Sequence, residues 1–240
     1  MDIEELNSYL DSDTTVSETN ETIVVKKENL WDVKDIAPVE IDITKKPVNT
    51  YAIQIYAGPG KAIPPEATAR LIGIIKFLAR KGYTLRHNGG TTDLMGINLK
   101  TLQKEDPTIK IDYYLPYKAF NKDVTEPVMN RPNRIGYGIA VKYREKFNDI
   151  TSNSARAIIA NDGHIMFGED GSKPNRMILV YNLNGLEEIP VKPKKEDWVG
   201  IGYTAYFLKL AAAGNINVFN FKNDISSRLK DFVAAVDTAI

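Results

Sequence analysis

The sequence lacks cysteine entirely and holds only two histidines among 240 residues. Without cysteine the chain forms no disulfide bond, and sites that need thiolate ligands are excluded. The two histidines, His87 and His164, are too few for the imidazole clusters that hold most transition metals. We therefore expect neither a metal site nor another cofactor. The composition is compatible with a reducing compartment.

The chain also lacks a long apolar run. No stretch of about 18 consecutive apolar residues is present, so we expect no membrane-spanning helix. The N-terminus is acidic, whereas a secretory signal begins with basic residues. These absences predict a cytoplasmic protein with no membrane partner. With 43% hydrophobic and 9% aromatic residues, the chain can still bury a core.

A net charge of zero hides an uneven distribution of charge. Residues 1–50 hold 12 Asp and Glu against 5 Lys, which leaves 26 Lys and Arg against 19 Asp and Glu in the rest of the chain. We therefore divide the chain into an acidic, partly disordered arm, residues 1–48, and a basic body, residues 49–240. The arm is expected to contact a protein partner or the basic surface of its own body. The alternative is a solvated tail.

Two short apolar stretches interrupt the polar arm, at residues 23–25 and 30–33. A segment of this kind is typical of a docking element. We expect these stretches to lie on the body as short strands.

Residues 51–93 carry the most regular pattern: strand, glycine loop, helix, strand, second glycine loop. An apolar run at residues 51–56 suits a buried strand, and Gly82 ends the helix. The apolar face of that helix is formed by Ala67, Leu71, Ile74, Ile75 and Leu78. Thr91 or Thr92 is placed to cap the helix that follows.

The same alternation continues along the body. Further strands are expected at residues 109–115, 176–182 and 216–221. Further helices are expected at residues 94–102, 204–213 and 225–239, and after Ser152 or Ser154. The alternation predicts an α/β fold, a Rossmann-like three-layer sandwich with a mostly parallel sheet of about five or more strands.

Two regions break this alternation. Residues 122–150 are expected to form a long excursion at the carboxyl edge of the sheet. Lys142, Arg144 and Lys146 lie there on a short alternating segment, where they extend a basic surface. Residues 186–197 read as a polar loop that contains prolines.

Three glycine loops, at residues 57–61, 88–92 and 200–204, follow strands or precede helices. In an open parallel sheet such loops converge on one edge, where backbone N–H groups can bind a phosphate. The candidates are Gly58, Gly60, Lys61, Asn88, Gly89, Gly90, Thr91, Gly200, Gly202 and Thr204. The alternative is that each loop is a tight turn without a ligand.

Five side chains near these loops suit a nucleic acid. Arg86, at the end of the second strand, is suited to a phosphate, or else to a salt bridge across the sheet edge. The neutral imidazole of His87 can hydrogen-bond a base, or it is merely exposed. Tyr117 and Phe120 flank Lys118 and suit base stacking beside a phosphate, although some aromatics of this segment must lie in the core.

Three segments, LRHNGGTTD at residues 85–93, YYLPYKAFN at 113–121 and GYTAYFLKLAAAGNINVFNF at 202–221, resemble the DprA/Smf-like family (DNA processing protein A). That family belongs to the SLOG superfamily of Rossmann-like domains, and phage members share these patterns. The resemblance covers residues 51–224. The chain departs from the pattern at Thr91 and Thr92, where the family has Ala-x-Gly, and it lacks a winged-helix extension.

The resemblance implies a single-stranded-DNA-binding protein that assists recombination or DNA processing without catalysis, and a homodimer fits this family. The first alternative is a SLOG-type small-nucleotide-binding protein or a nucleotide N-glycosidic hydrolase. One observation argues against an enzyme: Phe207 stands where the related phosphoribohydrolases carry a catalytic Glu. Asp93 and Asp162 are possible catalytic carboxylates, but their spacing in the sequence does not place them as a pair. The second alternative is a structural or interaction protein with a decayed site.

Overall fold

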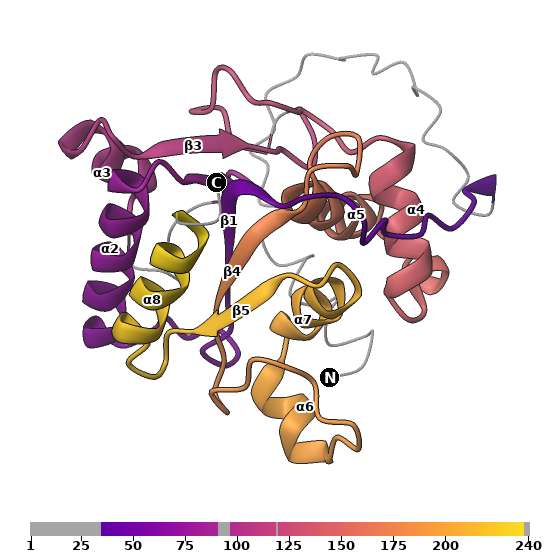
Figure 1. Cartoon of the computed structure of the whole chain (residues 1–240). Helices are drawn as coiled ribbons and strands as arrows, with labels where there is room; N and C mark the ends of the chain where they lie inside the picture. Colours follow the sequence, from indigo (N-terminus) through magenta and orange to yellow (C-terminus); the bar gives the residue numbers. More distant parts are fainter. Residues whose placement is uncertain (1–34, 91–96, 119, 238–240) are drawn as a thin grey trace.

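Five parallel strands form one sheet in the order β3-β2-β1-β4-β5 (Figure 1). The computed structural model describes residues 35–90, 97–118 and 120–237. The strands are β1 (Val48–Ile55), β2 (Thr84–His87), β3 (Lys110–Tyr113), β4 (Asn175–Tyr181) and β5 (Asn217–Asn220). The chain builds outward from β1 to β3 and then returns to the other side of β1. The predicted parallel sheet of five strands is confirmed.

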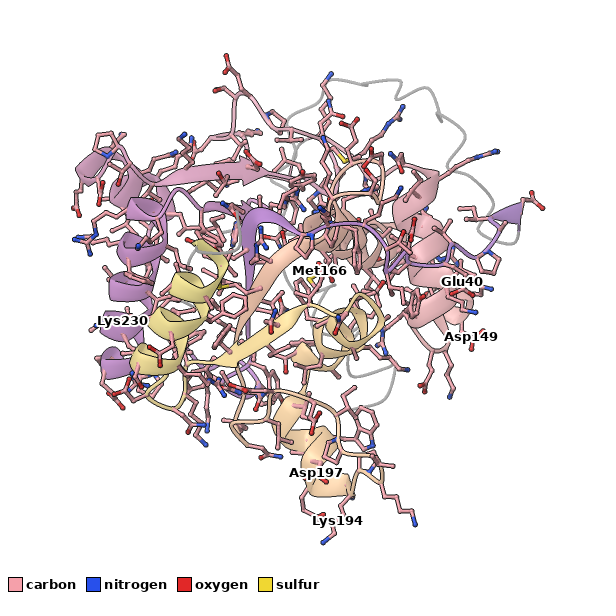
Figure 2. All side chains as sticks on the ribbon, viewed as in Figure 1. Glu40, Asp149, Met166, Lys194, Asp197 and Lys230 are labelled. Atoms are coloured by element: carbon pink, nitrogen blue, oxygen red, sulfur yellow. The ribbon has the colours of Figure 1, made fainter. Side chains whose placement is uncertain are left out.

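Helices cover both faces of this sheet (Figure 1). One face carries α2 (Pro65–Arg80), α3 (Leu99–Glu105) and α8 (Ser226–Asp237). The other carries α5 (Asn153–Phe167) and α7 (Thr204–Ala213), with α4 (Arg134–Tyr143) packed on α5. Met166 of α5 is fully buried near the centre of the molecule (Figure 2). The three-layer sandwich expected from the sequence is therefore the fold.

Helix α2 has the apolar face that its spacing predicts. Ala67, Leu71, Ile74, Ile75 and Leu78 are all buried against the sheet. The helix starts at Pro65, where a missing N–H costs nothing, and ends at Arg80. Gly82 follows with φ +77°, a left-handed conformation that lets the chain turn directly into β2.

The region at residues 122–150 contains a helix that the sequence reading missed. Helix α4 begins after Asn133, whose side chain accepts the Ile135 N–H. Lys142 lies in its last turn, so the short alternating segment expected there is wrong. A side chain at Gly136 would overlap the Ala160 carbonyl of α5, so this glycine permits close packing of the two helices. A short 3₁₀ helix, Phe147–Asp149, follows.

The expected loop and glycine turn before α7 contain another helix, α6 (Lys195–Ile201). Gly200 lies inside this helix and Gly202 ends it with φ +52°. The third glycine loop expected at residues 200–204 is therefore wrong, because these residues join two helices. Helix α7 has the predicted bounds.

Helix α3 starts later than the sequence suggested. Asn98 caps it by accepting the Thr101 N–H, so residues 97 and 98 precede the helix. The start expected at residue 94 and the caps expected at Thr91 or Thr92 lie outside the described residues. The helix ends at Glu105, three residues beyond the end expected at residue 102, and Asp106 follows as its C-cap.

Residues 36–41, in the described part of the arm, lie along α4. Val39 N–H donates to Gly138 O at 3.0 Å, and Ile41 N–H donates to the Tyr143 hydroxyl at 3.2 Å. Glu40 forms an ion pair with Lys142 at this edge of the molecule (Figure 2).

Within the described ranges, no helix is long and apolar enough to cross a membrane.

Leu78→Ala should lower the free energy of unfolding by about 3 kcal/mol, because Leu78 is fully buried and the change leaves a cavity. Leu183→Ala removes the same atoms from a side chain that is 38% exposed and should cost less than about 1 kcal/mol. Urea denaturation of both variants measures the difference. Equal losses would contradict the described core.

Candidate functional site

The carboxyl ends of the strands share one edge because all five strands are parallel. Along this edge the ends of β3, β2, β1 and β4 follow one another. After β1 the chain crosses to β2, and after β4 it crosses to β5. These two connections therefore run in opposite directions across the sheet, on the two sides of the β1–β4 pair. Such a reversal opens a crevice at the strand ends, and ligands of open α/β sheets bind there.

The first glycine loop, after β1, has an exposed tip. Gly58 and Gly60 have φ of +104° and +61°, and Lys61 N–H donates to Gly58 O at 3.2 Å. Gly58 is buried, whereas Gly60 and Lys61 are exposed. Of the three residues predicted here, two are therefore open to a ligand.

The second glycine loop is held to the segment after β3. Gly89, at φ +76°, accepts the Asn121 side-chain amide at 2.6 Å, and a side chain in its place would overlap Leu115. Asn88 accepts the Gly90 N–H at 2.8 Å. Asn88 and Gly90 are half-buried and reach the surface; Thr91 lies outside the described residues.

Arg86 lies inside the molecule, not on its surface. It is 4% exposed, its Nη1 donates to Lys173 O at 2.7 Å, and its guanidinium lies over the Tyr114 ring. Burial lowers the pKa of Arg86, an effect that Tyr114 and Asp112 oppose. Its Nε–H is buried without a partner in the described part of the chain. One donor of the guanidinium is thus unsatisfied.

A polar hollow of about 160 Å³ lies at the ends of β1 and β2; we name it the strand-end pocket. It is lined by Ile53, Gln54, Ile55, Arg86, His87, Asn88, Gly90, Asp162, Ile165 and Phe207. The pocket brings together four predicted residues, Arg86, His87, Asn88 and Gly90. The sequence reading missed Gln54, which carries no signal beyond being the polar residue in an apolar strand.

Asp162 of α5 brings a carboxyl group to the strand-end pocket. Among the described residues, no hydrogen bond or ion pair to this carboxyl is found, and burial raises its pKa well above the ordinary value. Burial and the nearby Asp162 also raise the pKa of Tyr206, whose hydroxyl is buried without a partner in the described ranges. The site therefore favours a neutral, protonated Asp162, which can donate a proton or a hydrogen bond.

His87 is a neutral ring within the pocket wall. Its Nδ1 accepts the Gly89 N–H at 3.0 Å, so the ring proton lies on Nε2. Burial lowers the pKa of His87 to about 4. The expectation of a neutral imidazole agrees with this environment, but the ring is buried, not loosely exposed.

The segment after β3 brings an exposed aromatic side chain to this edge. Tyr117 is 37% exposed, Lys118 is exposed and Phe120 is half-buried. The Tyr117 and Phe120 rings meet edge to face, with centroids 5.1 Å apart. Tyr114 is buried in the core, as at least one aromatic residue here had to be.

The third predicted group of phosphate-binding residues, Gly200, Gly202 and Thr204, is in contact with other residues of the protein. Thr204 is fully buried, donates to Ile201 O at 2.6 Å and accepts the Asn182 amide at 3.4 Å. A side chain at Gly200 would overlap Asn184, and one at Gly202 would overlap the Tyr56 ring. Packing of neighbouring side chains therefore accounts for these glycines.

His164 has a structural role. Its Nε2 accepts the Asn133 N–H at 3.2 Å, and its Nδ1 faces Gly168 O at 3.1 Å. Both ring nitrogens are thus engaged. The described part of the chain holds no cluster of His, Cys, Asp and Glu that could bind a metal ion.

Comparison with protein-family models, curated proteins and solved structures found no match for this chain. The resemblance to the DprA/Smf-like family remains a prediction from sequence.

His87 should make the stability of the fold sensitive to acid. The pKa of His87 is about 4 in the folded protein, below the ordinary value of 6.5. Between these two pH values the histidine is protonated in the unfolded chain but not in the folded protein, so the folded state loses stability as the pH falls. Between pH 7 and pH 4.5 the wild type should lose about 2 kcal/mol more stability than His87→Gln. Urea denaturation at both pH values measures this, and parallel losses would refute the assignment.

Proposed function

We propose that this chain binds single-stranded nucleic acid along the carboxyl edge of its sheet and assists DNA processing or recombination without covalent chemistry. The observation that carries the proposal is the exposed Tyr117 beside Lys118, in line with the strand-end pocket and the exposed loop that holds Lys61. A base is planar, and a phosphate is anionic. An exposed ring next to a lysine suits both groups of one nucleotide.

The order of the strands supports a linear binding surface. Tyr117 and Lys118 follow β3, Asn88 and Gly90 follow β2, and Lys61 follows β1. These strands are neighbours, so the three groups stand in a row at spacings of roughly 5 Å per strand. An extended strand of nucleic acid can meet them in succession.

The buried Arg86 also supports the proposal. It lines the strand-end pocket, and its unpartnered Nε–H is a donor that the described chain does not satisfy. A buried donor without a partner costs free energy, and a phosphate oxygen or a base acceptor would relieve that cost.

Tyr117→Ala should weaken binding of a labelled oligo-dT about tenfold, because one stacking platform is lost. Tyr117→Phe keeps the ring and should bind nearly as the wild type does. Fluorescence anisotropy at low salt measures both. Equal affinity of the wild type and Tyr117→Ala would refute the proposed surface.

Lys118→Ala should flatten the salt dependence of oligo-dT binding, reducing the slope of log K against log salt by about 0.7. Lys104→Ala, at another exposed lysine, on α3, is the matched control and should leave the slope unchanged. Anisotropy titrations at several salt concentrations give the slopes. An affinity that does not depend on salt would overturn the electrostatic part of the proposal.

A second candidate function is binding of a small nucleotide, with or without cleavage of its N-glycosidic bond. The observation that favours it is the strand-end pocket itself, where Asp162 has a raised pKa and Gln54 and Asn88 add amide groups. A protonated carboxyl can donate to a base nitrogen as a general acid. The pocket of about 160 Å³ then takes the base of one nucleotide, and a longer strand adds little affinity.

For this second candidate, Asp162→Asn should abolish the pH dependence of mononucleotide binding. The wild type should bind more weakly as the pH rises through the raised pKa of Asp162, because the ionised carboxylate can no longer donate to a base nitrogen. The side-chain amide of the variant keeps a donor at every pH. Asp231→Asn, exposed on α8, is the control. Isothermal titration with mononucleotides across pH 4 to 9 tests it; the same pH profile in both variants would count against the pocket.

A further inference from the structure

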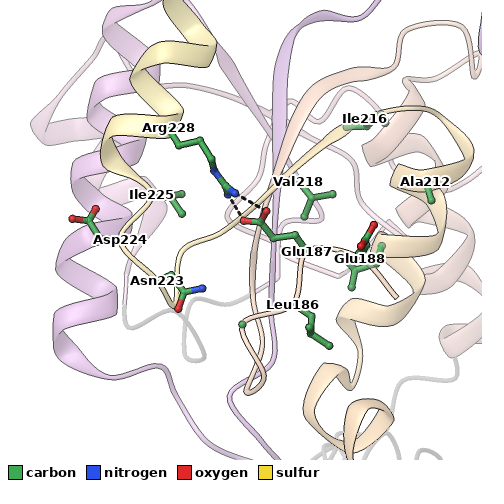
Figure 3. A pocket seen from close by; sticks show the side chains of 12 residues that line it. Leu186, Glu187, Glu188, Ala212, Ile216, Val218, Asn223, Asp224, Ile225 and Arg228 are labelled. Carbon is green, nitrogen blue, oxygen red and sulfur yellow. Dashed lines mark hydrogen bonds and ion pairs between the residues drawn. The ribbon is translucent and has the colours of Figure 1, made fainter. Parts of the chain in front are cut away.

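A groove of about 700 Å³ runs beside β5, at the opposite edge of the sheet from β3 (Figure 3). We name it the edge groove. Its lining residues are Gly185, Leu186, Glu187, Glu188, Leu208, Ala212, Ile216, Val218, Asn223, Asp224, Ile225 and Arg228. Helix α7 supplies one side and the start of α8 the other, with β5 between them. The groove is separate from the strand-end pocket.

Strand β5 pairs with β4 on one side only. Neighbouring residues of a strand direct their N–H groups to opposite edges. Phe221 N–H bonds Val180 O of β4 at 2.9 Å, whereas Asn220 N–H turns away and bonds Glu187 Oε1 at 2.8 Å. By the same alternation Val218 directs its N–H and C=O into the edge groove, which is the geometry that accepts an added strand.

The two ends of this edge differ. Arg228 reaches from α8 to Glu187 and pairs with both of its carboxylate oxygens (Figure 3). This ion pair covers Asn220 at the carboxyl end of β5. The described residues place no comparable acceptor on the Val218 N–H. The open part of the edge is therefore the beginning of the strand.

The groove combines apolar walls with an acidic rim. Leu208, Ile216 and Ile225 are buried in its walls, while Ala212 is exposed and Val218 is half-buried. The rim adds three acidic residues, Glu187, Glu188 and Asp224, against the one cation Arg228. An occupant that fits this surface is extended, carries β-branched side chains and is basic at one end.

We propose that the edge groove is occupied by residues 22–27 of this same chain, which pair with β5 as a sixth strand. Their sequence is Thr-Ile-Val-Val-Lys-Lys, with four β-branched residues and then two lysines. β-branched residues favour a strand, and the lysines complement Glu188 and Asp224. Of the three lysines among the first 34 residues, two lie in this segment.

The length of the arm allows this contact. Residues 36–41 lie along α4, α4 contacts α7, and α7 forms a side of the edge groove. Crossing two packed helices requires roughly 20 Å, at about 8–10 Å per helix. The eight steps along the chain from Lys27 to Asp35 span up to about 28 Å when extended. The segment can thus reach β5 of its own body.

Amide hydrogen exchange of the full chain, read by NMR at low concentration, tests the proposal. The Val218 amide should exchange at least about tenfold more slowly than an open edge amide, because the added strand accepts its hydrogen. Val24→Asp should restore fast exchange at Val218. Leu10→Asp, the same kind of change elsewhere in the arm, should leave it slow.

A charge change on the groove supplies an independent test that does not alter the arm. Glu188→Lys should speed exchange at Val218 several-fold, and Glu105→Lys on α3 should not. Fast exchange at Val218 in the wild type would overturn the proposal. A second result would also overturn it: slow exchange at Val218 that Val24→Asp does not change and that becomes slower as the protein concentration rises. That result would assign the groove to a second copy of the chain.

Discussion

The parallel pairing of β1 with β4 is the interaction on which the rest of the structure depends. It joins segments more than 120 residues apart and extends over most of both strands, from Val48 with Asn175 to Ile55 with Tyr181. Side chains on both faces of these strands are buried, so helices must cover both faces. Because β2 and β5 add to opposite sides of this pair, the chain reverses direction there, and the strand-end pocket lies beside the reversal.

Burial determines which protonation states the side chains at the carboxyl edge adopt. The edge places a guanidinium, an imidazole and a carboxyl in a small space, yet it removes much of their contact with water. Low solvation favours the neutral forms of His87 and Asp162. The interior of the site thus offers directional hydrogen bonds, while its exposed margin, with Lys61 and Lys118, offers charge.

Local patterns in the sequence predict the layers of the fold, because spacing of apolar residues reports which side of an element is covered. Leu71 and Leu78 illustrate this for α2. The pattern fails at α4, where Gly136 resembles a helix breaker but is required by the closeness of α5. It fails also at Gly200 and Gly202, since a glycine that admits a neighbouring side chain looks the same in sequence as one that admits a phosphate. Asp162 joins the site only through tertiary packing.

The ion pair between Glu187 and Arg228 has a consequence for colloidal behaviour. A sheet edge with unpaired backbone groups is a template on which other chains can add, and charged side chains at such an edge oppose this growth. By holding a carboxylate on the Asn220 N–H, the pair shortens the template that β5 presents. Because an exposed ion pair adds little to the folding equilibrium, the consequence of this one is mainly to oppose the addition of another chain at the carboxyl end of β5.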